Sequence, residues 1–306
     1  MKKNRLGTSD LYVSVLGLGC MSLGTEKEKA ISTIDKAVDL GINYLDTADL
    51  YDFGLNEEIV GEAIKRRRQD IILATKVGNR WEKGKDGWSW DPSKGYIKEQ
   101  VKNSLRRLQT DYIDLYQLHG GTTEDRIDET IEAFEELQAE GIIRYYGISS
   151  IRPNVIREYV QKSSIISVMM QYSILDRRPE EEMMDLLAEH NISIIARGPL
   201  AKGLLTNRGT KKLEEKFSGK DYLDYSYKEL CSIIPKLQQL RPHHTLNETA
   251  IQYCLHSPAV GAVIPGASSI EQLKENVHAA NSTPLSDEEK KQIQQLSKAN
   301  RYEAHR

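Results

Sequence analysis

The sequence is poor in cysteine, and it lacks both a long apolar run and a basic leader followed by an apolar segment. Its three cysteines, Cys20, Cys231 and Cys254, are widely separated and form no CxxC pair. This pattern indicates neither a disulfide framework nor a structural zinc site, and it is typical of a reducing compartment. Because no run of about 18 apolar residues is present, we expect a cytoplasmic protein with no membrane partner.

A strong charge of either sign is also absent. The chain carries 42 lysine and arginine residues against 45 acidic residues, which gives a net charge of −3 at neutral pH. Such a chain has no long-range positive field for a phosphate backbone, so we expect no nucleic-acid partner. With 39% hydrophobic and 28% charged residues, the composition is that of a globular protein. The 306 residues fit either two domains or one α/β barrel.

Short apolar runs alternate with segments of helical periodicity along most of the chain. The helical segments include 27–40, 56–65, 97–108 and 126–140. A doubly wound fold would need a GxGxxG turn, and LGLGCMSLG at 16–24 lacks the third glycine at the proper spacing. Eight parallel strands with helical crossovers instead predict one domain over 1–306, an α/β protein of the (β/α)8 TIM-barrel type. The expected strands are 14–19, 43–48, 71–76, 112–119, 144–149, 167–172, 193–198 and 261–266.

Two segments depart from this alternation. Residues 5–16 contain two strand-like pieces about a Gly/Thr/Ser/Asp turn, which predict a β-hairpin at the barrel bottom with no chemical role. Residues 203–246 form a long polar stretch in place of a short connection. Long loops in compact domains are usually functional or mobile, so we expect this stretch to form a flap over the site.

Titratable residues stand at the carboxyl ends of three consecutive predicted strands, where barrels place their active sites. These residues are Asp46, Lys76 and His119, and Tyr51 lies in the loop after the first of the three strands. A buried lysine needs an anion, for which Asp46 is the nearest candidate. A lysine ammonium makes a neighbouring phenol a stronger acid, and a neutral imidazole can hydrogen-bond the oxygen that the phenol protonates. Together the four residues indicate proton delivery to a carbonyl oxygen.

Each of these residues also has an ordinary interpretation when it is taken alone. Tyr51 could pack on the rim of the barrel, and Asp46 could cap a turn. Lys76 could extend from the strand end to water, and His119 could be a core histidine. Their joint occurrence at neighbouring strand ends favours the catalytic interpretation.

Several stretches resemble the signatures of the aldo-keto reductase family, in the family's order and spacing. They are YLDTADLYDFGLNE (44–57), ATKVG (74–78), DLYQLH (114–119), GIS (147–149), Gln171 and IPGASSIEQLKEN (264–276). The resemblance implies a (β/α)8 barrel and reversible hydride transfer between a nicotinamide cofactor and an aldehyde or ketone. It also implies that Tyr51 is the proton donor and that Lys76 strengthens its acidity. Asp46 would hold Lys76, and His119 would position the carbonyl group.

The same resemblance implies which residues bind the cofactor. Ser149 and Gln171 would hold the nicotinamide carboxamide, and Glu275 and Asn276 would hold the adenine. The other implied cofactor residues lie at strand ends and in the loops that follow them: Gly19, Cys20, Met21, Asp46, Ser150, Arg197, Gly198, Pro199, Leu200, Lys202, Gly203, Ile264, Gly266, Ser268 and Gln272.

Two positions near the nicotinamide depart from the family pattern. Ser150 stands where the family frequently has asparagine. Arg197 stands where many members place an aromatic ring against the nicotinamide. A fixed cation there would disfavour the positively charged oxidised form of the ring and favour the reduced cofactor. The alternative is that Arg197 forms an ion pair with a neighbouring carboxylate.

The phosphate end departs from the pattern as well. Gly266 replaces a basic residue beside Pro265, and Gln272 stands where some members have arginine. The helix that begins here offers free N–H groups to a phosphate, and Ser268 adds a hydroxyl. The missing positive charge could come from Lys274 or from the 203–246 stretch. We expect NADP(H) in preference to NAD(H).

All three tryptophans lie in one loop after the third strand. Trp81, Trp88 and Trp90, with Phe53 beside Tyr51, predict the wall of an apolar substrate pocket. The alternative is that the loop folds on its own aromatic side chains.

These observations predict a cytoplasmic NADPH-dependent reductase of small carbonyl compounds that acts as a monomer or small homo-oligomer. One alternative is a slow-turnover, cofactor-sensing regulatory subunit that resembles the potassium-channel β-subunits. A metal-dependent hydrolase would need clustered histidine and carboxylate ligands at strand ends, where His119 is the only histidine. We therefore expect no metal.

Overall fold

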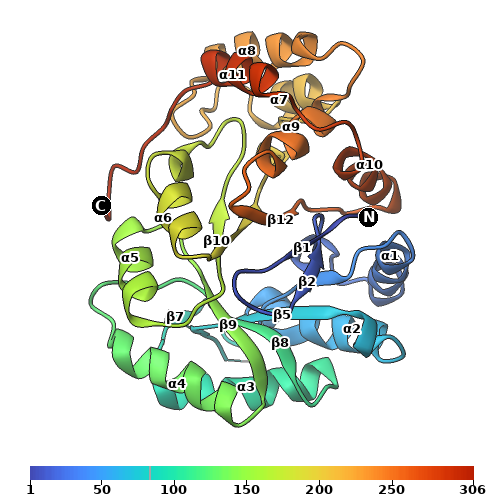
Figure 1. The fold of residues 1–306 in the computed structure, drawn as a ribbon. Helices are drawn as coiled ribbons and strands as arrows, with labels where there is room; N and C mark the ends of the chain where they lie inside the picture. Colours follow the sequence, from blue (N-terminus) through green and yellow to red (C-terminus); the bar gives the residue numbers. More distant parts are fainter. Residues whose placement is uncertain (83) are drawn as a thin grey trace.

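Eight parallel strands curl into a barrel in the computed structural model, which describes residues 1–82 and 84–306 (Figure 1). Neighbouring strands follow the order β12-β11-β10-β9-β8-β5-β4-β3. Backbone bridges Leu16–Val263 and Gly19–Gly266 join the two edges and close the barrel. The strands are β3 (Leu18–Gly19), β4 (Tyr44–Asp46), β5 (Ile72–Val77), β8 (Ile113–Leu118), β9 (Ile143–Ser149), β10 (Ser167–Gln171), β11 (Ser193–Arg197) and β12 (Val260–Ile264).

Helices follow the strands and cover the outside of the barrel (Figure 1). Those that alternate with the barrel strands are α1 (Lys27–Asp39), α2 (Leu55–Ile64), α3 (Lys94–Leu108), α4 (Ile127–Ala139), α5 (Pro153–Lys162), α6 (Met183–Glu189), α9 (Leu246–Leu255) and α10 (Ile270–Ala280). Short 3-10 helices lie at η1 (Cys20–Ser22), η2 (Tyr51–Gly54), η3 (Arg68–Asp70), η4 (Arg178–Glu180) and η5 (Ala201–Gly203). The structure confirms the predicted (β/α)8 barrel. No helix of the described residues is long and apolar enough to cross a bilayer.

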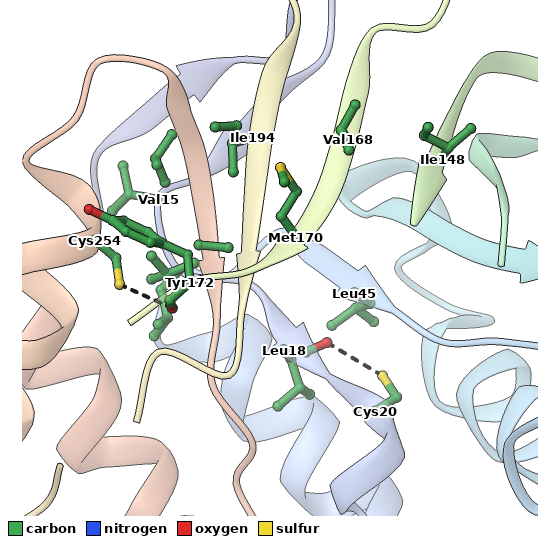
Figure 2. Close-up of a cluster of buried hydrophobic side chains, with 14 of the residues drawn as sticks. Val15, Leu18, Cys20, Leu45, Ile148, Val168, Met170, Tyr172, Ile194 and Cys254 are labelled. Carbon is green, nitrogen blue, oxygen red and sulfur yellow. Dashed lines mark hydrogen bonds between the residues drawn. The ribbon is translucent and has the colours of Figure 1, made fainter. Parts of the chain in front are cut away.

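Neighbouring residues on a strand pack into two different layers of the core. Met169 of β10 belongs to the cluster inside the barrel, together with Ile195 of β11. Val168 and Met170 pack outward against the helices, and Figure 2 shows them in this layer with Ile194. Successive side chains on a strand point to opposite faces, and both faces are apolar here because both are buried. This explains why the strands read as continuous apolar runs in the sequence.

The amino-terminal segment closes one end of the barrel. Strands β1 (Lys3–Arg5) and β2 (Tyr12–Ser14) pair antiparallel, which confirms the predicted hairpin. Leu6, Leu11 and Val13 join the cluster inside the barrel. Gly7 between the strands has a φ of +50°, and a Cβ at this position would lie 2.4 Å from the Ile166 carbonyl oxygen. Only glycine fits this close approach of the hairpin to the barrel.

Two helices lie in the 203–246 stretch, where we expected a loop. They are α7 (Gly209–Lys216) and α8 (Tyr227–Leu240). Ser226 and Glu229 form a capping box at the start of α8, and this helix packs against α7 and α11 (Asp287–Leu296) at the top of Figure 1. The stretch reads as polar because each helix buries only one narrow side.

Candidate active site

The strand ends bring the predicted catalytic residues together at the carboxyl end of the barrel. Asp46 is the last residue of β4, Lys76 lies near the end of β5, and His119 directly follows β8. These three strands are neighbours in the sheet. Tyr51 begins the 3-10 helix η2 after β4. Parallel strands share one edge at their carboxyl ends, so residues far apart in sequence meet here.

The Lys76 ammonium is the centre of this group. Its Nζ lies 2.6 Å from Asp46 Oδ2 and also donates to the Thr47 carbonyl oxygen at 2.8 Å and to Tyr51 Oη at 3.2 Å. An ammonium has three N–H donors, so all three are occupied. The Lys76 side chain is fully buried. Burial acts to lower the pKa of Lys76, but Asp46 and Tyr51 favour the charged form and the pKa is raised above its usual value.

Tyr51 lies between Lys76 and His119. The Tyr51 and His119 rings meet edge to face, with centroids 5.8 Å apart and an interplanar angle of 84°. Burial, together with the positive charges of Lys76 and Arg197, lowers the pKa of His119 to about 3. The imidazole is therefore neutral at pH 7 and keeps one N–H donor. The phenol and a neutral imidazole can both hydrogen-bond one oxygen atom in the site.

The turn that carries Tyr51 has an unusual backbone. Asp52, Phe53 and Gly54 have φ values of +48°, +51° and +87°. Successive non-glycine residues in the left-handed region are costly, and such strain is concentrated at functional sites. The Tyr51 N–H donates to the Ala48 carbonyl oxygen at 3.2 Å, which fixes the start of the turn.

Two polar residues that sequence reasoning missed support the catalytic group. Gln117 lies on β8, two strands from β4 in the sheet, and its Nε2 donates to Asp46 Oδ1 at 3.3 Å. Asn56 accepts a hydrogen bond from Thr47 Oγ1 at 2.7 Å and donates to the Cys20 carbonyl oxygen at 2.9 Å. Asn56 thus joins the loop after β3 to the end of β4. Both residues are buried amides, and the available signal was a glutamine between Tyr116 and Leu118 in the fully buried strand β8.

A cavity of about 660 Å³ opens from the catalytic group along the carboxyl end of the barrel. Tyr51, after β4, and Asn247, on α9, are both among the residues that line it. The predicted cofactor residues that line it are Gly19, Met21, Asp46, Gln171, Arg197, Gly198, Pro199, Leu200, Lys202, Gly203, Ile264, Gly266, Gln272, Glu275 and Asn276.

Four predicted cofactor residues do not line this cavity. The Cys20 thiol is buried in the outer core layer and points to the Leu18 carbonyl oxygen (Figure 2). Ser150 Oγ accepts from the Arg152 N–H at 3.2 Å, and Ser268 Oγ donates to Gln272 Oε1 at 3.1 Å. Ser149 ends β9, next to β10 in the sheet.

The cavity also has a basic wall that the sequence only hinted at. Arg208, Lys211, Lys212 and Lys216 line it from α7 and the residue before that helix. Lys211 and Lys212 follow Arg208 by three and four residues, and Lys216 follows Lys212 by four, which puts them on one side of a helix. Further lining residues not predicted are Ser22, Met169, Thr206, Asn207, Glu215, Tyr222 and Pro265. Lys274 is not among the lining residues.

Arg197 forms no ion pair with any described residue. Its Nη1 donates to Gln171 Oε1 at 3.0 Å, which holds the guanidinium at the cavity. Asp176 is already engaged by Arg178, whose Nε and Nη2 each lie 2.7 Å from a carboxylate oxygen. The alternative interpretation of Arg197 as a structural ion pair is therefore not found in the described part of the chain.

The aromatic side chains of the predicted substrate wall have different surroundings. The Trp81 ring lies 5.7 Å from that of Phe53, on the loop beside Tyr51. Trp90 Nε1 donates to Asp125 Oδ1 at 2.9 Å, so this residue links β7 (Ser89–Trp90), which pairs with β6 (Asn79–Arg80), to the loop after β8. Trp88 is exposed. None of the four lines the cavity of about 660 Å³, and their role in substrate binding stays a prediction.

The described residues contain no group of three or more histidine, cysteine, aspartate or glutamate side chains placed to hold a metal ion. The site does fit a nicotinamide dinucleotide, because the cavity joins the catalytic group to a basic wall.

Comparisons with known proteins agree with this geometry. The model of the Aldo/keto reductase family matches residues 15–298. The chain is 63% identical to the "Uncharacterized oxidoreductase YqkF" of Bacillus subtilis (strain 168), over 100% of both chains. It is 32% identical to the "NADH-specific methylglyoxal reductase" of Escherichia coli (strain K12), over 98% of this chain and 99% of the relative.

A solved structure shows the same likeness. The holo form of aldo-keto reductase AKR11C1 from Bacillus halodurans superposes with a TM-score of 0.93 at 62% identity, over 100% of this chain and 99% of that chain. The chain therefore belongs to the aldo-keto reductase family of oxidoreductases, which use a nicotinamide cofactor.

Proposed function

We propose that the protein reduces aldehydes or ketones to alcohols with NADPH, with Tyr51 as the general acid. The observation that carries this proposal is the buried chain from Asp46 through Lys76 to Tyr51, with contacts of 2.6 and 3.2 Å, at the wall of the cavity. It places a phenol beside a cation that is itself held by a carboxylate.

The bound cofactor would supply a hydride to the carbonyl carbon. Tyr51 Oη donates its proton to the carbonyl oxygen, and the Lys76 ammonium stabilises the phenolate that remains. Asp46 offsets the cost of burying Lys76. The neutral His119 imidazole orients the carbonyl oxygen by a hydrogen bond.

The chain's own residues also suggest how the cofactor is held. Gln171 and Ser149 stand at neighbouring strand ends beside the catalytic group, where amide and hydroxyl groups can bind the carboxamide. Glu275 and Asn276 line the cavity on α10 and suit the adenine end. The basic wall of Arg208, Lys211 and Lys212 favours the additional phosphate of NADP(H) over NAD(H).

We also propose that residues 1–306 act as one domain whose 203–246 segment covers the bound cofactor. The support is that this segment lines the cavity from Gly203 to Tyr222. The free cysteines of the chain, Cys20, Cys231 and Cys254, suit a reducing cytoplasm. The expected substrate is a small carbonyl compound, handled by a monomer or small homo-oligomer.

One titration tests the reductase assignment. The wild-type protein is titrated with NADPH and then with NADH while tryptophan fluorescence is followed, and 4-nitrobenzaldehyde is then added while NADPH absorbance is recorded. Tight NADPH binding followed by NADPH oxidation is the expected result. Binding without turnover would favour the cofactor-sensing alternative, and no binding would overturn the assignment.

A further inference from the structure

At the end of the cavity next to Tyr51, one positive charge has no salt-bridge partner among the described residues. Asp46 and Lys76 form an ion pair there, and Asp176 and Arg178 form another close by. Arg197 has a hydrogen bond to Gln171 but no carboxylate partner among the described residues. Burying a guanidinium without an anion costs free energy. We therefore expect the Arg197 charge to have a function in the cavity.

The position of Arg197 limits what this charge can act on. Arg197 lines the same cavity as Tyr51 and Gln171. After burial and Lys76, Arg197 is the next cause that lowers the pKa of His119, and Tyr51 acts to raise the pKa of Arg197. The guanidinium is therefore within electrostatic reach of both groups that face the carbonyl oxygen.

The chemistry of carbonyl reduction brings the cofactor ring to the same place. Hydride goes to the carbonyl carbon while the proton goes to the oxygen bonded to it, so the ring must lie beside Tyr51 and hence near Arg197. The ring is neutral when reduced and carries one positive charge when oxidised. A fixed cation beside it repels the oxidised form only.

We propose that Arg197 is a specificity-determining residue that makes the site bind the reduced cofactor more tightly than the oxidised cofactor. This inference rests on the proposed function, because it assumes that a nicotinamide cofactor occupies the cavity. The preference keeps the site loaded with the reduced cofactor and limits inhibition by the oxidised product, while the same charge makes the bound reduced cofactor a weaker hydride donor. Gln171 acts as the positioning residue, since its side-chain oxygen holds the guanidinium.

The test measures binding rather than turnover. Dissociation constants for NADPH and NADP⁺ are determined by isothermal titration calorimetry for the wild type, Arg197→Met and Arg197→Lys. Methionine keeps much of the length without the charge, and lysine keeps the charge. Lys211→Met is the matched control, because it removes a cation from the basic wall of the same cavity.

In the wild type we expect NADP⁺ to bind about tenfold or more weakly than NADPH. Arg197→Met should reduce this ratio by about tenfold, which corresponds to about 30 mV in the midpoint potential of the bound two-electron couple. Arg197→Lys should retain most of the ratio. Lys211→Met should weaken both forms by the same factor and leave the ratio unchanged.

Several results would overturn the inference and identify what is wrong. If the wild type binds neither form, the proposed function fails. If Arg197→Met binds both forms with the wild-type ratio, the proposed function stands and the role of Arg197 fails. If that variant instead shows a higher KM for 4-carboxybenzaldehyde but an unchanged KM for 4-nitrobenzaldehyde, Arg197 binds a substrate anion. Circular dichroism confirms that each variant is folded.

Discussion

Lys76 and Asp46 form an ion pair with 2.6 Å between Nζ and Oδ2, and both side chains are almost completely buried. Each charge is compensated mainly by the other, because bulk water does not reach the Lys76 side chain. Removal of one partner would leave the other charge buried and uncompensated, which is far more costly than the loss of an exposed pair.

Asp46→Asn should therefore destabilise the protein by about 3–5 kcal/mol. The measurement is the free energy of unfolding in urea. Glu62→Gln is the control, since Glu62 pairs with Lys27 at an exposed site and its loss should leave the unfolding midpoint nearly unchanged. Similar midpoints for the two variants would show that the buried pair contributes little.

Tyr51→Phe should lower the rate of carbonyl reduction by about 10²–10⁴-fold, because phenylalanine has no proton to donate. The affinity for NADPH should stay near the wild-type value, since the phenol acts on the substrate. Steady-state kinetics and a binding titration measure the two effects separately. Tyr12→Phe, on the exposed side of the hairpin, is the control and should keep full activity. A large loss of NADPH binding in Tyr51→Phe would contradict the assigned role.

His119 should make the protein less stable as the pH falls. Its pKa is about 3 in the folded protein and near 6.5 when unfolded. Between these two pH values, the imidazole is protonated in the unfolded chain but not in the folded chain. This penalty is absent above about pH 6.5 and grows as the pH falls from there toward 3. The free energy of unfolding, measured between pH 7 and 4, should decrease less steeply in His119→Gln than in the wild type. Parallel curves would show that the imidazole is accessible to protons in the folded state.

Lys211→Met should raise the Kd for NADPH by about tenfold and leave the Kd for NADH unchanged, because only the first cofactor has the additional phosphate. Lys228→Met is the matched control, since Lys228 lies on the next helix and is exposed. Equal weakening of NADPH and NADH would place Lys211 near the part that the two cofactors share.

The sequence predicted the barrel because strands buried on both faces form continuous apolar runs, and polar residues or glycine mark the end of each run. It also predicted Asp46, Lys76 and His119, since strand ends in a barrel share one location. The 203–246 stretch was predicted as one possible source of positive charge, but the residues of the basic wall were not identified, because the direction of Arg208 and Lys211 depends on a short polar helix whose phase cannot be read without its packing partner. Asn56 was missed for a related reason, because a buried amide that links two loops is recognised only once both loops are placed.

The three hydrogen bonds of Lys76 also determine how the site responds to the compounds that we expect it to accept. Aldehydes condense with free amines, but that condensation requires a deprotonated nitrogen with an available lone pair. Lys76 is held as an ammonium by Asp46, the Thr47 carbonyl oxygen and Tyr51, and its side chain is buried. The lysine is thereby protected from covalent modification by reactive aldehydes that enter the cavity.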